Sequence, residues 1–199
     1  MFLGLFDNLT QLREHLLTSF TGCADLRAGA THLVFGEGAV GAPLLVIGEA
    51  PGADEDRMGR PFVGRSGKLL RRLLTEAGFG EQELYITNTV FWRPPNNRPP
   101  TPAEVLDCAP FLREHIQLVA PRALLLVGAT AARAILQRDG SMAALRDCWH
   151  AVDMNGEKRP ARVVFHPAYL LRNPPATPIV QRDLALVRTA VLNNNFTAI

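Results

Sequence analysis

Residues 44–67 read LLVIGEAPGADEDRMGRPFVGRSG, and we expect the rest of the chain to be arranged around this stretch. The apolar run at 44–47 predicts a buried strand, and GEAPG at 48–52 predicts a tight, rigid loop after it. Glycine allows close backbone approach, and Pro51 fixes its own φ. Phe62 lies between Pro61 and Gly64, so an aromatic ring is presented on a stiff loop. Such a loop suits a flat polar ring as its ligand, and the alternative is an ordinary strand, loop and helix with a core phenylalanine.

The composition bounds the class of protein. The 199 residues are 47% hydrophobic and 20% charged, which is ordinary for a globular domain. The net charge of +2 permits a nucleic-acid partner without indicating one. Asp7 and Asn8 interrupt the N-terminal apolar run, which argues against a signal peptide, and no apolar run approaches the ~20 residues of a membrane span. Three widely spaced cysteines argue against a disulfide framework and for a reducing compartment. We expect a cytoplasmic monomer without a membrane partner, with one domain over 1–199 and residues 1–43 as its N-terminal helix and lead-in.

Four short apolar runs, at 44–47, 84–87, 123–127 and 162–165, are expected to be strands. Helical patterns lie between them, which predicts a parallel sheet covered by helices on both faces. Ligands bind outside the carboxyl ends of the strands in such sheets. The residues that follow the four strands are Gly48 and Glu49, then Asn88, Gly128 and His166. An acid, an amide and an imidazole should therefore converge at one rim, although each alone is commonly a turn residue or a half-exposed polar side chain.

Apolar residues at helical spacing predict helices at 7–20, from the first loop to Gly78, after a Pro-rich turn at 93–100, after the third strand, and at 179–192. The expected N-caps of the first four are Asp7 or Asn8, Ser66, Thr101 and Thr130. Pro102 and Glu104 complete a capping box with Thr101, and Pro110 should kink or split that helix. The lead-in at 21–43 should be irregular, with a possible edge strand at 33–35.

The segment HPAYLLRNP at 166–174 places three apolar residues between two prolines, beside an arginine. Apolar wedges on such loops can enter a base stack. The alternative is that Tyr169 and Leu170 begin a helix and pack inward. Arg93, Arg98 and Arg172 should lie near the same rim, where they could neutralise phosphates or simply be solvated.

Four segments in order resemble the fourth family of uracil-DNA glycosylases. They are GEAPGADEDRMGRPFVGRSGKLL at 48–70, YITNTVFWRPPNNRPPTPAEV at 85–105, LLLVGATAA at 124–132 and FHPAYLLRNP at 165–174. Each motif alone is weak, but all four in this order are specific, and the similarity covers about residues 23–188. The resemblance implies a three-layer α/β/α sandwich around a mainly parallel four-stranded sheet. It also implies an enzyme that flips uracil out of single- or double-stranded DNA and hydrolyses its N-glycosidic bond, the first step of base-excision repair.

The resemblance also implies roles for individual residues. Phe62 matches the aromatic residue that stacks on the flipped base, Asn88 the amide that reads uracil's edge, and His166 the histidine that contacts O2. The catalytic candidates are His166, Glu49 and Glu55. The uracil-binding candidates are Gly48, Glu49, Ala50, Pro51, Gly52, Phe62, Asn88 and His166. The DNA-binding candidates are Arg60, Arg65, Ser66, Arg93, Arg98, Tyr169, Leu170, Leu171 and Arg172.

The chain departs from the family pattern at the position of a cofactor. Family members usually hold a [4Fe–4S] cluster on four cysteines, and the matching positions here are Phe20, Cys23, Trp92 and Cys108. Because a cluster normally takes four thiolates and only two are present, we expect neither a cluster nor a metal.

Alternatives remain for the mechanism. Ala50 stands where the related first family has a water-activating aspartate, and the adjacent Glu49 would point differently. A branch that attaches covalently to DNA carries a histidine-containing insertion after the asparagine motif, whereas residues 91–105 contain no histidine. A non-catalytic module that binds uracil-containing or single-stranded DNA is the alternative from a different functional class.

Overall fold

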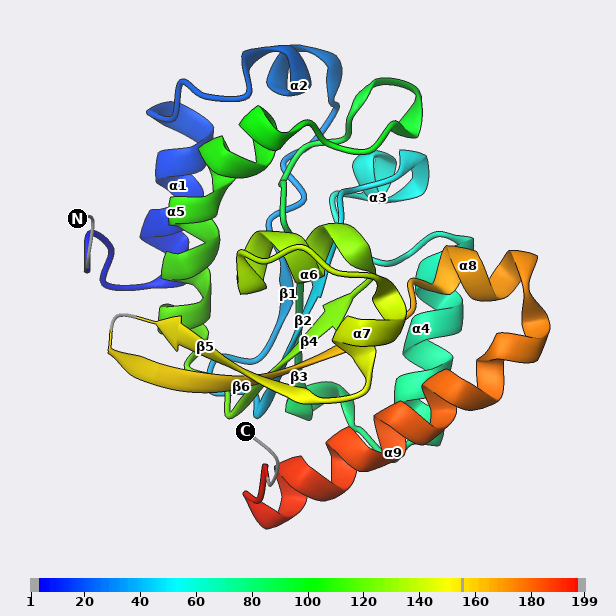
Figure 1. The fold of residues 1–199 in the computed structure, drawn as a ribbon. Coiled ribbons are helices and arrows are strands. Elements are labelled where there is room, and N and C mark those ends of the chain that lie inside the picture. The colour runs from blue at the N-terminus through cyan, green and yellow to red at the C-terminus, as the bar shows by residue number, and fades with distance from the viewer. Residues whose placement is uncertain (1–3, 155, 197–199) are drawn as a thin grey trace.

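The computed structural model describes residues 4–154 and 156–196, which are built around a six-stranded sheet (Figure 1). In chain order the strands are β1 (Glu37–Gly38), β2 (Leu44–Gly48), β3 (Leu84–Asn88), β4 (Ala123–Val127), β5 (Trp149–Met154) and β6 (Glu157–Val164). Their order in the sheet is β1-β3-β2-β4-β6-β5. The four central strands run parallel, and β1 and β5 pair antiparallel at the two edges.

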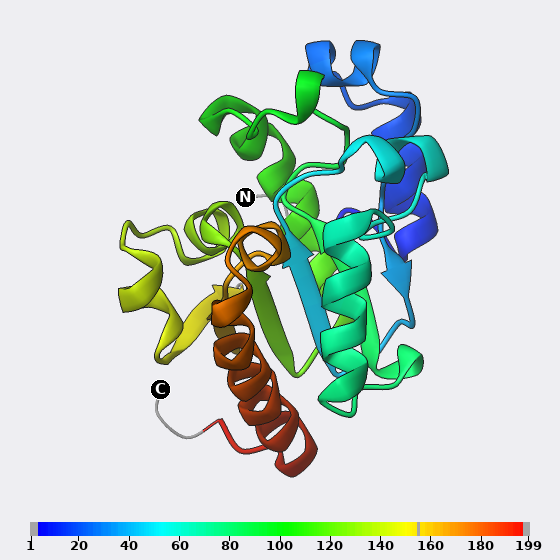
Figure 2. The ribbon, with the colours of Figure 1, turned by 90° about the vertical axis from the view of Figure 1, so that its right-hand side faces the viewer.

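Helices cover both faces of the sheet. They are α1 (Leu9–Thr18), α2 (Ala24–Gly29), α3 (Ala53–Met58), α4 (Arg65–Glu76), α5 (Pro102–Val119), α6 (Ala129–Leu136), α7 (Met142–Arg146), α8 (Pro167–Arg172) and α9 (Thr177–Asn193). Short 3-10 turns occur at Glu81–Glu83, Pro95–Asn97 and Pro174–Ala176. Figures 1 and 2 show α1 and α5 on one side of the sheet and α4 and α9 on the other.

Successive residues of β2 point into two separate hydrophobic cores, as strand geometry requires. Leu45 and Ile47 pack with residues of α1, α5 and α6, whereas Leu44 and Val46 pack with residues of α4 and α9. Each of β2, β3 and β4 has five residues and all of them are buried, which is typical of parallel strands covered on both faces. The predicted three-layer sandwich is confirmed.

The four predicted strands are confirmed as the parallel centre of the sheet, but the expectation of four strands in total is wrong. β5 and residues 157–162 of β6 form an antiparallel hairpin, in which Trp149 lies opposite Arg162. At the other edge, β1 pairs with β3. The edge strand of the lead-in is therefore at 37–38 and not at the expected 33–35, and the lead-in also contains the helix α2.

Several helix ends differ from the sequence prediction. Asn8 caps α1 and the Thr101 capping box opens α5, both as expected. Ser66 and Thr130, however, lie inside α4 and α6, because Gly64 and Gly128 hold the two N-cap positions. The helix α5 runs continuously through Pro110, so it is not split.

The expected loop after His166 is a helix. Pro167 occupies its first position, where the missing N–H costs nothing, and α8 extends from there to Arg172. Leu170 packs into the core formed with α4 and α9. No helix within the described residues is long and apolar enough to cross a bilayer.

Candidate active site

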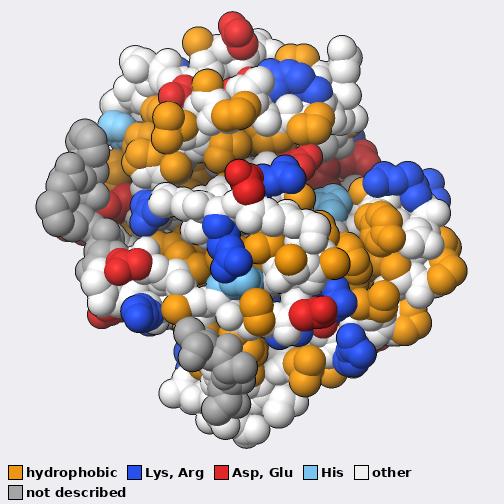
Figure 3. All heavy atoms as spheres, in the orientation of Figure 1, with side chains coloured by type: hydrophobic (Ala, Val, Ile, Leu, Met, Phe, Trp, Pro, Cys, Tyr) orange, Lys and Arg blue, Asp and Glu red, His pale blue; other side chains and the backbone are white. Residues whose placement is uncertain are grey.

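A cleft of about 470 Å³ opens at the carboxyl ends of the central parallel strands. Figure 3 shows a hollow on this face that holds acidic and histidine side chains, with basic and hydrophobic side chains on its border. Residues from the loops after β2, β3 and β6 and from the first turn of α4 line the cleft. In register, Gly48 pairs with Asn88, so the ends of β2 and β3 lie at the same level. The predicted convergence of strand-end residues is therefore confirmed.

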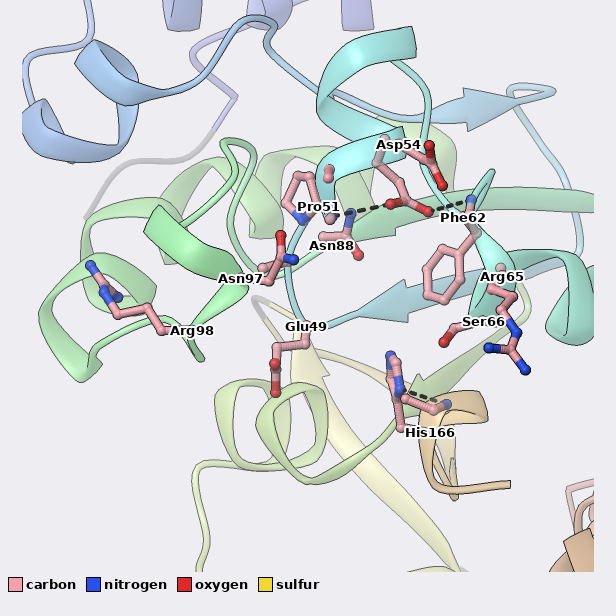
Figure 4. A pocket seen from close by; sticks show the side chains of 17 residues that line it. Glu49, Pro51, Asp54, Phe62, Arg65, Ser66, Asn88, Asn97, Arg98 and His166 are labelled. Atoms are coloured by element: carbon pink, nitrogen blue, oxygen red, sulfur yellow. Dashed lines mark hydrogen bonds between the residues drawn. The ribbon is translucent and has the colours of Figure 1, made fainter. Parts of the chain in front are cut away.

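Asn88 contributes an amide to the floor of the cleft (Figure 4). Its side chain is buried, with 2% exposure of the residue, and within the described residues its Nδ2 has no hydrogen-bond partner. A buried donor without a partner costs free energy, so it is suited to a ligand that supplies an acceptor. Any side chain at Gly48 would collide with Asn88 Oδ1 and with the ring of Phe62. Glycine is thus required at position 48 for these two groups to approach.

His166 lies across the cleft and caps the N-terminus of α8 (Figure 4). Its Nδ1 accepts a hydrogen bond from the backbone N–H of Ala168, 3.2 Å away. Burial lowers the pKa of His166; Glu49 and Glu55 oppose this shift and Arg172 adds to it. The neutral imidazole then carries its hydrogen on Nε2, because Nδ1 is the acceptor. The lowered pKa of His166 favours the neutral imidazole, in which Nε2 is the donor.

Phe62 has an unusual backbone conformation, with φ at +53°, and its ring lines the cleft at 6.4 Å, centroid to centroid, from His166. Glu55 supports the loop on which it stands. The Glu55 carboxylate accepts hydrogen bonds from the backbone N–H groups of Val63 at 2.9 Å, Gly64 at 2.8 Å and Gly52 at 3.2 Å. Both oxygens of this predicted catalytic acid are therefore engaged in joining the loop at 48–52 to the Phe62 loop.

Glu49 lines the cleft, and the hydroxyl of Thr130 donates a hydrogen bond to its Oε2. Thr130 lies in the first turn of α6, just after the end of β4. We expected it only to cap a helix, and its position after a strand of the same rim is the signal that could have placed it at the site. The other uracil-binding candidates, Ala50, Pro51 and Gly52, also line the cleft.

The DNA-binding candidates divide into three groups. Arg65, Ser66 and Arg98 line the cleft, although Arg98 forms two hydrogen bonds to the Glu104 carboxylate, at 2.9 and 2.6 Å. Arg60 and Arg93 do not line it: Arg60 pairs with Glu37, and Arg93 donates to Asn97. On α8, Tyr169, Leu171 and Arg172 are exposed.

Leu170 corrects the prediction for this segment. It is 1% exposed and packs in the core, so it has no surface to offer to DNA. For Leu170, the alternative that it packs inward from a helix is therefore correct. Leu171 is 36% exposed, by contrast. Sequence reasoning also missed Asn97 and Ala168 as lining residues.

The four positions that match the cluster ligands of the resembled family belong to one hydrophobic core. The Cys23 and Cys108 sulfurs lie 3.7 Å apart, and the Phe20 and Trp92 rings stack with centroids 5.6 Å apart. The phenyl ring of Phe20 has no heteroatom and the indole N–H of Trp92 is a donor only, so neither ring offers a ligand atom for iron. The thiolates number two where a cluster normally takes four, so the residues do not fit a [4Fe–4S] cluster. Across the described ranges, no group of three or more His, Cys, Asp or Glu residues is placed to hold a metal ion.

Comparison with known proteins places this cleft in a family context. Residues 35–187 match the family model described as the uracil DNA glycosylase superfamily. A type-4 uracil-DNA glycosylase of Thermotoga maritima is 39% identical over 168 residues, which are 84% of this chain and 85% of that protein. The type-4 enzyme of Pyrobaculum aerophilum is 38% identical over 156 residues, 76% and 79% of the two chains. The type-4 enzyme of Saccharolobus solfataricus is 35% identical over 167 residues, 81% and 77% of the two chains.

Proposed function

The chain belongs to the uracil-DNA glycosylase superfamily, and from this premise we propose that it flips uracil out of DNA, hydrolyses its N-glycosidic bond and leaves an abasic site. One observation carries the proposal: the buried Asn88 amide, the neutral His166 imidazole and the Phe62 ring face one cleft (Figure 4). A base outside the helix stack needs a pocket with a hydrogen-bonding edge and an aromatic face. The cleft offers both.

Asn88 supplies the edge that reads uracil. Uracil presents an acceptor at O4 beside a donor at N3, so the Asn88 Nδ2–H can donate to O4 while Oδ1 accepts from N3–H. Nδ2 has no other partner within the described residues, so it is available for this bond. Cytosine presents the reverse pattern and would leave buried polar groups unpaired, which a site of this kind rejects strongly.

His166 stabilises the negative charge that develops on uracil as the N-glycosidic bond breaks. As the C1′–N1 bond cleaves, its electron pair moves into the base and negative charge develops on O2, while the sugar becomes cationic. A neutral Nε2–H donor aimed at O2 stabilises that charge in the manner of an oxyanion hole. Phe62 packs on the face of the base and keeps it in register with both groups.

Water completes the reaction by adding to C1′ and losing a proton, and the uracil anion takes up a proton to leave as neutral uracil. Ala50 has no side-chain group that could act as a base toward this water. Glu49 lines the same cleft, and Thr130 fixes its carboxylate, so we assign Glu49 the role of orienting this water. Glu55 has a different role, because its oxygens are occupied by three backbone N–H groups: it holds the loops together.

The DNA strand should cross the mouth of the cleft beside α4 and α8. Arg65 and Ser66 stand in the first turn of α4, where backbone N–H groups and the helix dipole favour a phosphate. Ala168 lines the cleft, and Leu171 and Arg172 follow it by three and four residues, so they share its face of α8. Leu171, and not the buried Leu170, is therefore the wedge we assign to the space left by the flipped base.

The enzyme we propose works without an iron–sulfur cluster, as a monomer in the cytoplasm, with residues 1–199 forming one domain. Support for the missing cluster comes from the Phe20–Trp92 stack, which belongs to the same hydrophobic core as Cys23 and Cys108. Support for a reducing compartment comes from the three free thiols of Cys23, Cys108 and Cys148.

A non-catalytic uracil-DNA-binding protein is the competing function. Incubation with a labelled strand that contains one uracil, followed by alkali, separates the two. The glycosylase produces a strand break at the uracil position, and an unmodified strand does not break. A protein that retards uracil-containing DNA in a gel but yields no alkali-sensitive site is a binding protein.

A further inference from the structure

The backbone of Phe62 needs support from its surroundings. A residue other than glycine at positive φ is held in a region that L-amino acids disfavour, and such a conformation persists only where neighbouring groups over-determine it. Glu55 fixes the N–H groups of Val63 and Gly64 on one side. The carbonyl groups of Pro61 and Phe62 must be fixed by other residues.

Arg71, in the middle of α4, binds those carbonyl groups. Its Nε donates to the oxygen of Phe62 at 3.0 Å, and its Nη2 donates to the oxygen of Pro61 at 2.9 Å. One planar guanidinium thus fixes two successive peptide units, which a single ammonium group could not do with the same geometry. Arg71 itself is half-buried and does not line the cleft.

Glu37, in the edge strand β1, orients Arg71. Its Oε2 lies 3.3 Å from Arg71 Nη2, and Arg60 donates to both of its oxygens, at 3.0 and 2.7 Å. Hydrogen bonding by Arg60, aided by Arg71, lowers the pKa of Glu37, so the carboxylate stays ionised near neutral pH. Arg60, a predicted DNA contact, thereby belongs to this support.

The loop that carries Phe62 packs closely against α4 and cannot move toward it. A side chain at Gly67 would collide with the backbone of Phe62. The Phe62 peptide is therefore held between α4, the Arg71 guanidinium and the Glu55 carboxylate, and the direction of its ring follows from these contacts.

We propose that Arg71, oriented by Glu37, is a positioning residue that fixes the Phe62 ring against the flipped base. This inference rests on the proposed function, in which Phe62 stacks on uracil. Loss of the guanidinium frees the peptides at 61–62, and the ring can then leave its position over the base. A misplacement of about 1 Å can cost up to ~10²-fold in rate.

The test compares Arg71→Met, Arg71→Lys and a matched control, Arg72→Met. Arg72 is the next residue of α4, is exposed, and among the described residues its ion-pair partner is Glu76 of the same helix. Single-turnover rates of uracil release, dissociation constants for uracil-containing DNA, and thermal midpoints are measured for each variant. We expect Arg71→Met to slow release by about 10- to 100-fold with nearly unchanged DNA binding, since the ring acts on the bound base. Arg71→Lys should recover part of the rate, and Arg72→Met should match wild type.

A double-mutant cycle with Phe62→Ala separates positioning from a general loss of stability. If Arg71 acts through the ring, Arg71→Met should cost no more than about two-fold in the Phe62→Ala background, which is the additivity error of independent sites. A full, additive loss in that background refutes the role, and so does an Arg71→Met enzyme as fast as Arg72→Met. A wild-type protein that releases no uracil refutes the proposed function itself, which keeps the two failures distinct.

Discussion

Replacing His166 with alanine removes one hydrogen-bond donor from the position where charge develops on uracil O2. The donor is defined by the structure, since the Ala168 N–H occupies Nδ1 and leaves the hydrogen on Nε2. One such donor contributes about 2.7–4 kcal/mol to the transition state, which corresponds to a rate loss of roughly 10²–10³-fold. DNA binding should change little, because the contact strengthens only as the bond breaks.

Single-turnover cleavage of a uracil-containing strand measures this loss, with His32→Ala as a control, because His32 is exposed and does not line the cleft. The pH dependence gives a second readout. Burial lowers the pKa of His166, so the neutral donor should be lost, and the rate should fall, only at a pH below ~6.5, the ordinary histidine pKa. A His166→Ala rate within a few-fold of wild type, or a wild-type rate that halves near the ordinary histidine pKa, would refute this reasoning.

Asn88→Asp should lower the uracil rate and raise the relative rate on cytosine, because a carboxylate accepts from cytosine N4 and cannot donate to uracil O4; an unchanged uracil rate would remove Asn88 from base reading. Trp92→Ala should lower the free energy of unfolding by ~3–5 kcal/mol, as the truncation of a core residue does, and the wild-type protein should contain no iron. Near-stoichiometric iron with broad visible absorbance would show that a cluster is bound and would contradict this role of Trp92. Leu171→Ala should slow cleavage of double-stranded more than single-stranded uracil DNA, whereas Leu170→Ala should mainly lower the thermal midpoint; equal effects of Leu171→Ala on both substrates would contradict the wedge. Burial lowers the pKa of His115 to about 3, whereas the unfolded chain should have the ordinary value of ~6.5. The contribution of neutral His115 to stability is therefore complete above pH ~6.5. It is lost as pH falls from there toward 3, by up to ~1.4 kcal/mol per pH unit. His115→Gln should reduce that slope in chemical denaturation, and an identical slope would mean that other groups carry it.

The residues at the strand ends could be predicted from the sequence. Buried parallel strands have continuous apolar runs, and their carboxyl ends must meet at one rim, so Glu49, Asn88 and His166 could be brought together before the structure was known. The edge hairpin was missed because the first half of β6 contains Lys158, Arg159 and Pro160, which conceal a strand whose start is exposed.

The roles of Glu55 and Arg71 could not be read from the sequence. Each acts on backbone groups of a loop eight to ten residues away, and no local propensity encodes which peptide a long side chain will reach. For a similar reason, the sequence of the α8 segment allowed two interpretations. Whether Leu170 faced DNA or the core depended on the position of α4 and α9, which the local pattern does not contain.

Direct measurement of free uracil tests the central claim most closely. Uracil-containing DNA in large excess over the protein is incubated, the released base is quantified by chromatography and mass spectrometry, and the DNA is examined on a denaturing gel. We predict many uracil molecules per protein molecule, an equal number of abasic sites, and no DNA attached to protein. Retention of uracil in the DNA would show a binding protein, and no more than one uracil per protein with covalently attached DNA would show the attaching branch; either result would contradict the account.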